Sequence, residues 1–211
     1  MRAAVLVAAV ALTAAACGTA DVVETPAAPT PPAVTSATAE AVPSSTPDLE
    51  RRLVAATKAN EVAEAIALIE AGTDVNAKDA IEDSAFLYAG AEGLNDILVA
   101  TLEHGADVHS TNRFGGTALI PAAEHGHVET VRILIDAGVP VNHVNDPGWT
   151  ALLEAVVYGD GSARYVDVVG QLLDAGADPS IRDARGLTAL QNAQARGQQD
   201  VVALLTAAEA N

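Results

Sequence analysis

The sequence is poor in aromatic residues, basic residues and cysteine. Only six of its 211 residues are Phe, Trp or Tyr, although half of the chain is hydrophobic and alanine is abundant. A composition with so few large rings favours thin, closely packed helices over a bulky globular core. The single cysteine, Cys17, excludes an internal disulfide.

Positive charge is scarce too. The chain has 11 Lys and Arg against 28 Asp and Glu, which gives a formal net charge of −17. Only Arg2, Asp21, Glu24 and Glu40 precede residue 48, so −15 of this charge belongs to the region after residue 47. Such a field repels phosphate backbones and anionic lipid, because affinity for nucleic acid depends on Lys and Arg. The sequence therefore predicts basic or neutral partners and no nucleic-acid binding.

Motifs for catalysis and metal binding are lacking as well. The sequence has no Gly-x-Ser-x-Gly, no phosphate-binding loop and no cysteine outside the N-terminal segment. Its five histidines do not have the spacing of a zinc site. We therefore expect no catalytic residue, no metal site and no cofactor.

The N-terminus carries a short apolar run behind a positive end. Met1 and Arg2 precede a stretch of apolar or small residues from Ala3 to Ala16. As a helix these 14 residues would span only ~21 Å, less than the ~30 Å hydrocarbon layer of a bilayer. The pattern predicts a signal peptide over residues 1–16.

The end of this run resembles a bacterial lipobox, in which a lipidated cysteine becomes the mature N-terminus. The resemblance rests on Ala14-Ala15-Ala16-Cys17-Gly18, and it departs from the usual pattern because Leu12 lies two places too early. It implies lipidation of Cys17 and an exported lipoprotein of the bacterial cell membrane, facing outward or the periplasm. Ordinary cleavage, releasing a secreted soluble protein, and an uncleaved signal anchor are the alternatives.

A polar and proline-rich segment follows. Residues 18–47 contain six Pro, nine Ser or Thr and seven Ala, with no aromatic residue. Such a composition cannot bury enough apolar surface to offset the entropy of ordering. We expect residues 17–47 to form a lipidated cysteine and a disordered tether, which would reach from ~30 Å as a coil to ~90 Å when extended.

Two independent ladders then mark an internal repeat. Ser84-Ala85-Phe86 aligns with Thr-Ala-Leu at 117–119, 150–152 and 188–190, at spacings of 33, 33 and 38 residues. The second ladder has the same three intervals and consists of Gly72, Gly105, Gly138 and Gly176. Identical intervals in two registers, including the irregular one, indicate a repeat architecture.

Each unit has the local chemistry of a helix pair. A Ser or Thr, as at Thr117, is predicted to cap a short first helix, which ends at a glycine such as Gly126. A second helix has apolar residues at helical spacing over 128–135. It closes on Ala-Gly before an extended finger such as residues 139–142.

These units closely resemble ankyrin repeats. The resemblance rests on Gly-Gly-Thr-Ala-Leu at 115–119, on residues 122–129 and on Leu-Leu-Asp-Ala-Gly-Ala-Asp at 172–178. It implies an all-α repeat solenoid of helix-turn-helix pairs with β-hairpin-like fingers, in a monomeric domain over residues 48–211. The expected repeats are 48–79, 80–112, 113–145, 146–183 and 184–211. The outer two are expected to be caps; the first matches the repeat only in its second helix and finger, with a polar helix around Leu49 to Thr57 before them.

In this family, partners dock on the concave face formed by the fingers and first helices. By their register in the repeat, the residues expected on that face are Arg113, Phe114, Glu124, His125, Trp149, Tyr158, Arg185 and Arg196. They are flanked by Ile81, Asp83, Glu92, Pro147 and Leu187. Aromatic and Arg side chains are common anchors of interfaces. The alternative is that Phe114 and Trp149 only pack between adjacent fingers.

The irregular spacing places a five-residue insertion within residues 159–167, where we expect a lengthened turn between two helices. A neutral loop extension is one interpretation. The other is a small-ligand or catalytic site at Glu154, Asp160, Arg164 and Tyr165, because the local sequence resembles bacterial ankyrin proteins with the same extended turn.

Together these features predict a non-catalytic protein-binding scaffold displayed at the bacterial cell envelope, with an envelope or periplasmic protein as partner and membrane contact only through Cys17. Small-ligand binding or enzymatic activity centred on residues 159–167 is the alternative. A structural spacer, or an effector delivered to another cell, is a third hypothesis.

Overall fold

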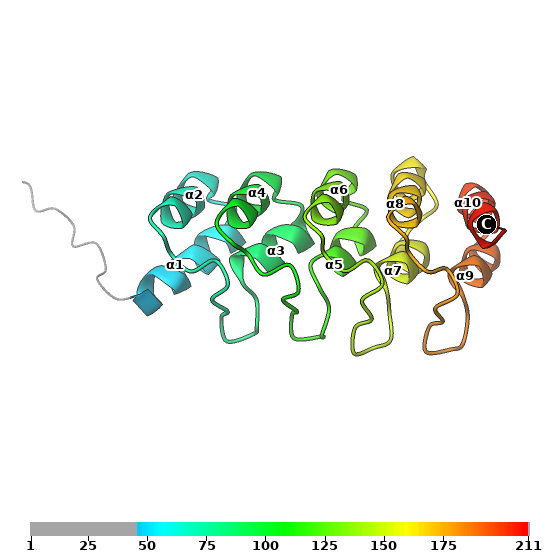
Figure 1. The fold of residues 1–211 in the computed structure, drawn as a ribbon, viewed down its shortest axis with the longest axis horizontal. Coiled ribbons are helices and arrows are strands. Elements are labelled where there is room, and N and C mark those ends of the chain that lie inside the picture. Colours follow the sequence, from blue (N-terminus) through cyan, green and yellow to red (C-terminus); the bar gives the residue numbers. More distant parts are fainter. Residues whose placement is uncertain (1–45, 211) are drawn as a thin grey trace, which may run out of the picture. The chain divides into compact units, whose positions relative to one another are not determined.

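The computed structural model describes residues 46–210, in which ten helices form five consecutive pairs (Figure 1). The pairs are α1 (Thr46–Lys58) with α2 (Val62–Glu70), α3 (Ala85–Glu92) with α4 (Asn95–Glu103), α5 (Leu119–Glu124) with α6 (Val128–Asp136), α7 (Ala151–Tyr158) with α8 (Ala163–Asp174), and α9 (Ala189–Arg196) with α10 (Gln199–Glu209). The predicted signal peptide, Cys17 and nearly all of the tether lie outside the described residues.

The pairs stack side by side, so the all-α repeat solenoid is confirmed. The first helices of the pairs form one row, next to four extended fingers, and the second helices form a parallel row on the other side (Figure 1). No β-strand is assigned within residues 46–210, and the fingers consist of turns and irregular backbone. None of the described helices is both long and apolar enough to cross a membrane.

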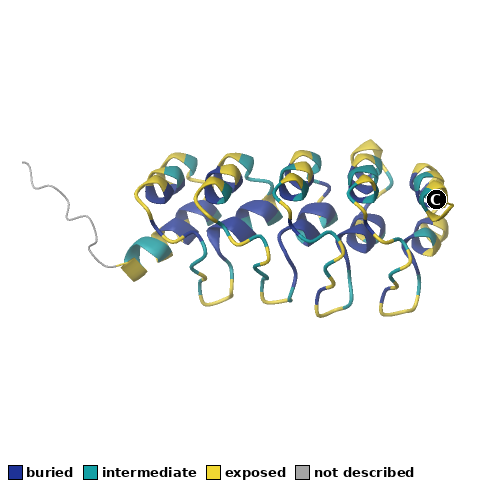
Figure 2. Cartoon of the chain, in the orientation of Figure 1, coloured by how far each residue is buried: buried dark blue, intermediate teal, exposed yellow. Residues whose placement is uncertain are grey.

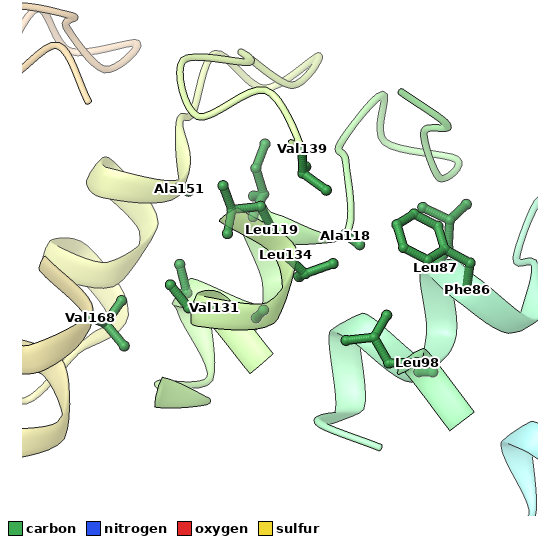
Figure 3. Close-up of a cluster of buried hydrophobic side chains, with 14 of the residues drawn as sticks. Phe86, Leu87, Leu98, Ala118, Leu119, Val131, Leu134, Val139, Ala151 and Val168 are labelled. Atoms are coloured by element: carbon green, nitrogen blue, oxygen red, sulfur yellow. The ribbon is translucent and has the colours of Figure 1, made fainter. Parts of the chain in front are cut away.

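The hydrophobic core runs continuously between the two rows (Figure 2). Phe86 and Leu119 of the first helices and Leu98 and Leu134 of the second helices are fully buried there (Figure 3). Alanine at 89, 122 and 155 lets the first helices pack closely, as the scarcity of large rings predicts. Because each pair buries its apolar side against its neighbours, stability is shared along the row.

Side-chain caps begin three of the first helices but not α5. Ser84, Thr150 and Thr188 each accept a hydrogen bond from the backbone N–H three residues on. The predicted cap at Thr117 is wrong, because its hydroxyl is buried without a hydrogen-bond partner among the described residues. The cause is Pro121, which has no N–H to donate to the Thr117 carbonyl. The Ile120 N–H donates to that carbonyl instead and is lost to the cap.

An Asn or Asp at a fixed place in each finger organises the turn before the next first helix. Asp79, Asn112 and Asp183 accept with one side-chain oxygen from two backbone N–H groups, two and four residues on. The side-chain oxygen of Asn145 accepts from the backbone N–H of Trp149, four residues on. These bonds fix the turns that carry the residues expected on the binding face.

The insertion does not simply lengthen a turn, as the sequence led us to expect. The turn of residues 159–162 is only slightly longer than its counterparts, whereas α8 has 12 residues and α2, α4 and α6 have nine each. Most of the inserted chain therefore belongs to the helix, which begins directly after Ser162. Residues 163–167 lie within α8.

Candidate functional site

A groove of about 470 Å³ lies beside the first helices of the second, third and fourth units. We call it the central groove. Its helical side is lined by Tyr88, Ala91, Glu92, Ile120, Pro121, Glu124, His125, Glu154 and Tyr158. Its finger side is lined by Asp83, Asn112, Arg113, Phe114, Gly116, Asn145 and Pro147. Residues 33 positions apart thus form one continuous surface.

Exposed aromatic side chains border this groove. Phe114 is 51% exposed and Tyr158 is 58% exposed, which is unusual for large apolar side chains. The partly buried ring of Trp149 lies 6.3 Å from the ring of Tyr158, tilted by 57°. The Arg113 guanidinium lies over the Phe114 ring, 4.6 Å from its centre. The rim therefore offers flat apolar surface that is held in place by its neighbours.

The basic groups of the groove already have partners. An Arg113 nitrogen lies 3.6 Å from an Asp83 carboxylate oxygen, and the same carboxylate lies 2.9 Å from the Lys58 ammonium. The His125 Nδ1 atom lies 2.8 Å from the Ala91 carbonyl oxygen, within hydrogen-bonding distance. The positive charge at the groove is therefore held at its Asp83 end.

The carboxyl group of Glu154 is the most perturbed group in the groove. Glu154 is 7% exposed, and burial together with the nearby negative charge of Glu124 raises its pKa to about 7, against a hydrogen bond from Asn145. Its Oε2 atom has no hydrogen-bond partner among residues 46–210. Within residues 46–210, no three His, Cys, Asp or Glu side chains form a group that would hold a metal ion.

Comparison with known proteins identifies the repeat. A family model for ankyrin repeats in three copies matches residues 85–183. The structure is similar to that of an ankyrin repeat domain from Acinetobacter baumannii AYE, with 60% sequence identity, a TM-score of 0.73, and coverage of 74% of this chain and 80% of that one. The chain belongs to the ankyrin-repeat family.

A second ankyrin repeat structure, of the protein EF0377, is 42% identical, with a TM-score of 0.70 and coverage of 73% of this chain and 78% of that one. A comparison with curated proteins finds no significant match. Ankyrin repeats typically form non-enzymatic scaffolds that mediate protein–protein interaction.

The ankyrin register brings most of the residues expected on the binding face to one place. Arg113, Phe114, Glu124, His125 and Tyr158 all line the central groove. Trp149 lies next to the groove, against Tyr158.

The two arginines expected at the C-terminal end lie apart from the groove lining. Arg185 donates to the Asp183 carboxylate and to Asn192. Arg196 donates across 3.3 Å to the carbonyl of Gly159 and thereby connects the last two units.

The structure divides the four residues expected around the insertion. Glu154 lines the central groove, whereas Asp160, Arg164 and Tyr165 do not. Asp160 accepts a hydrogen bond from the Ser162 backbone. The Arg164 guanidinium lies over the Tyr165 ring, and the buried Tyr165 hydroxyl donates to the Glu124 carbonyl across 2.9 Å.

Sequence reasoning missed several groove residues for which the register already held a signal. Tyr88 and Pro121 occupy the same position of their repeats as Glu154, four residues after the Ser or Thr that precedes the first helix. Asn145, at the organising position of its finger, was missed as well. Glu154 was grouped with the insertion, so its equivalence to Tyr88 and Pro121 was not recognised from the sequence.

Proposed function

We propose that this ankyrin domain is a non-catalytic protein-binding scaffold whose partner docks in the central groove and on its aromatic rim. The observation that carries the proposal is the exposure of Phe114 and Tyr158 beside a preformed groove. Large rings lose little conformational entropy on binding and bury much apolar area, so they are common anchors of interfaces. The groove extends over three units, as a polypeptide partner requires.

The charge of the domain narrows the class of partner. A region with a net charge of −15 attracts basic proteins and repels nucleic acid and anionic membranes. We therefore propose that a neutral or basic protein binds a monomeric scaffold. The alternative of a small-ligand or catalytic site at the insertion has less support, because Arg164 and Tyr165 pack on each other and Tyr165 is buried.

We further propose that the chain is exported and held at the bacterial envelope by a lipid on Cys17, with residues 17–47 as its tether. The support is the apolar run of residues 1–16 followed by a lipobox-like sequence. Proteomic analysis after globomycin treatment tests this proposal, since a lipoprotein precursor would accumulate. Unchanged processing would reject lipidation and favour a secreted protein or an uncleaved anchor.

Crosslinking of the full chain in its native envelope tests the groove as a docking surface. The double variant Phe114→Ala, Tyr158→Ala should lose the crosslinked partner, because it removes the proposed anchors of the interface. Both rings are exposed, so their removal should barely affect folding. Val99→Ala is the matched control, since Val99 is an exposed apolar residue on α4, outside the groove. Retention of every partner by the double variant would argue against docking in the groove.

A further inference from the structure

The third and fourth fingers of the domain each pair with the following helix through one amide and one carboxyl side chain. The carboxyl group belongs to the helix in one unit and to the finger in the other. In the last unit, the finger residue Asp183 pairs with the helix residue Asn192, nine positions on. In the unit before it, the finger residue Asn145 pairs with the helix residue Glu154, again nine positions on. The amide and the acid have exchanged places between two equivalent sites.

The two carboxylates differ in how fully they are satisfied. Asp183 accepts with both oxygens, from the backbone of Arg185 and Leu187 and from the side chains of Arg185 and Asn192. Glu154 is also buried, yet one of its oxygens has no partner in the part of the chain that the structure describes. A buried carboxylate that lacks a partner is costly, so structural pairing alone does not account for Glu154.

The surroundings of Glu154 make this cost greater. Glu124 lies close enough for its negative charge to act on Glu154, and no cation of the groove offsets it. Two tyrosines and five charged or titratable side chains line the groove besides Glu154. The five are Asp83, Glu92, Arg113, Glu124 and His125. Arg113 is held at Asp83, and His125 interacts with a backbone carbonyl.

We propose that Glu154 and Glu124 form a subsite for one basic side chain, an arginine or a lysine, of the polypeptide bound in the central groove. The inference rests on the proposed function, since it assigns part of the same groove. Tyr158 follows Glu154 by one helical turn, so its exposed ring shares that face of α7 and offers the cation a π surface. A basic side chain of the partner would place beside this pair the positive charge that the groove itself does not provide.

The groove favours a side chain of a polypeptide over a small free cation. Its volume of about 470 Å³ exceeds the space of one basic side chain, and it continues from Glu154 to the exposed ring of Phe114. A peptide would place a basic residue at the acidic pair and an apolar residue near Phe114. The acidic charge of the domain attracts such a peptide from a distance.

Selection from a phage-displayed library of random dodecapeptides against the immobilised full chain tests the subsite. We expect peptides that share one fixed Arg or Lys. Their binding to Glu154→Gln should weaken roughly tenfold or more, because a hydrogen-bonded charge pair is lost. Glu103→Gln is the matched control, since it removes the same charge from the exposed end of α4 and should bind like the wild type.

The outcomes separate this inference from the proposed function. Peptides that need Phe114 and Tyr158 but share no basic residue, or that bind Glu154→Gln unchanged, would overturn the subsite and leave the groove as a docking surface. Selection of no peptide, or only of peptides indifferent both to Phe114→Ala, Tyr158→Ala and to Glu154→Gln, would overturn both. Self-association of the full chain that Phe114→Ala, Tyr158→Ala abolishes and Glu154→Gln leaves unchanged would assign the groove to a second copy and overturn the subsite.

Discussion

The side-chain amide of Asn192 donates to the buried carboxylate of Asp183 across 3.2 Å, and it also donates to the Thr188 carbonyl. This pair joins the last finger to the start of α9. Burial alone would raise the pKa of Asp183, but hydrogen bonds from Leu187, Arg185 and Asn192 outweigh it and lower the pKa to about 2. The turn before α9 therefore depends on an ionised carboxylate.

Substitution of Asp183 should separate the contribution of its charge from that of its oxygen. Asp183→Ala leaves buried N–H groups unpaired and should lower the free energy of unfolding by roughly 2 to 4 kcal/mol. Asp183→Asn keeps an acceptor, as Asn112 and Asn145 do in other fingers, and should cost less. Urea denaturation measures both, and equal losses would contradict a separate role for the acceptor oxygen.

The same carboxylate predicts a dependence on pH. Because the pKa of Asp183 is lower in the folded state than in the unfolded chain, its stabilisation is present above pH ~4 and is lost as the pH falls through about 2. The difference in unfolding free energy between the wild type and Asp183→Asn should shrink over that interval. A difference that stays constant down to pH 2 would contradict this assignment.

A matched pair of substitutions tests the capping difference. Thr150→Val removes a hydroxyl that accepts from the Leu153 backbone, and should destabilise the domain by about 1 kcal/mol. Thr117→Val removes a buried hydroxyl that has no partner within residues 46–210, and should be neutral or stabilising. Thermal and urea denaturation distinguish the two. Equal destabilisation would show that Thr117 also acts as a cap.

Much of the fold was predictable because the repeat shows itself in short sequence signals. The ladder of Gly72, Gly105, Gly138 and Gly176 corresponds to the left-handed residues that end second helices, each with φ near +85°. The first-helix caps were predictable in the same way, except where Pro121 redirects the backbone. That exception depends on a single missing N–H, which a general repeat pattern does not reveal.

The groove was predictable in part. The register placed Phe114 among the finger residues and Tyr158 among the first-helix residues of one face, because equivalent positions of stacked units lie in rows. The environment of Glu154 was not predictable, since its burial depends on how α7 packs against α5 and on the turn around Asn145. Sequence spacing also could not divide the insertion between a turn and the start of α8.

Glu154 should destabilise the domain increasingly as the pH rises. Its pKa of about 7 in the folded state exceeds the value near 4.5 of an unfolded chain, so the folded protein binds the proton more tightly. Stability should therefore fall between pH ~4.5 and ~7, by roughly 1 to 3 kcal/mol from this group. In Glu154→Gln that loss should disappear, whereas Glu103→Gln should keep it. Denaturation at pH 5 and pH 8 measures the difference, and parallel curves for Glu154→Gln and the wild type would contradict it.

Tyr165 should connect the inserted part of the fourth unit to the third unit. Its hydroxyl donates to the carbonyl of Glu124, the last residue of α5. Carbonyl groups at the end of a helix lack an intrahelical donor. Tyr165→Phe keeps the buried ring and removes only this bond, so it should lower the free energy of unfolding by about 1 kcal/mol.

Tyr158→Phe is the control for this substitution, because that side chain is exposed at the groove rim. Hydrogen exchange adds a local measurement, since amides at the end of α5 should open more readily in Tyr165→Phe than in the control. Unchanged stability and unchanged exchange would mean that the ring of Tyr165, packed against Gly126 and Gly159, joins the two units without its hydroxyl.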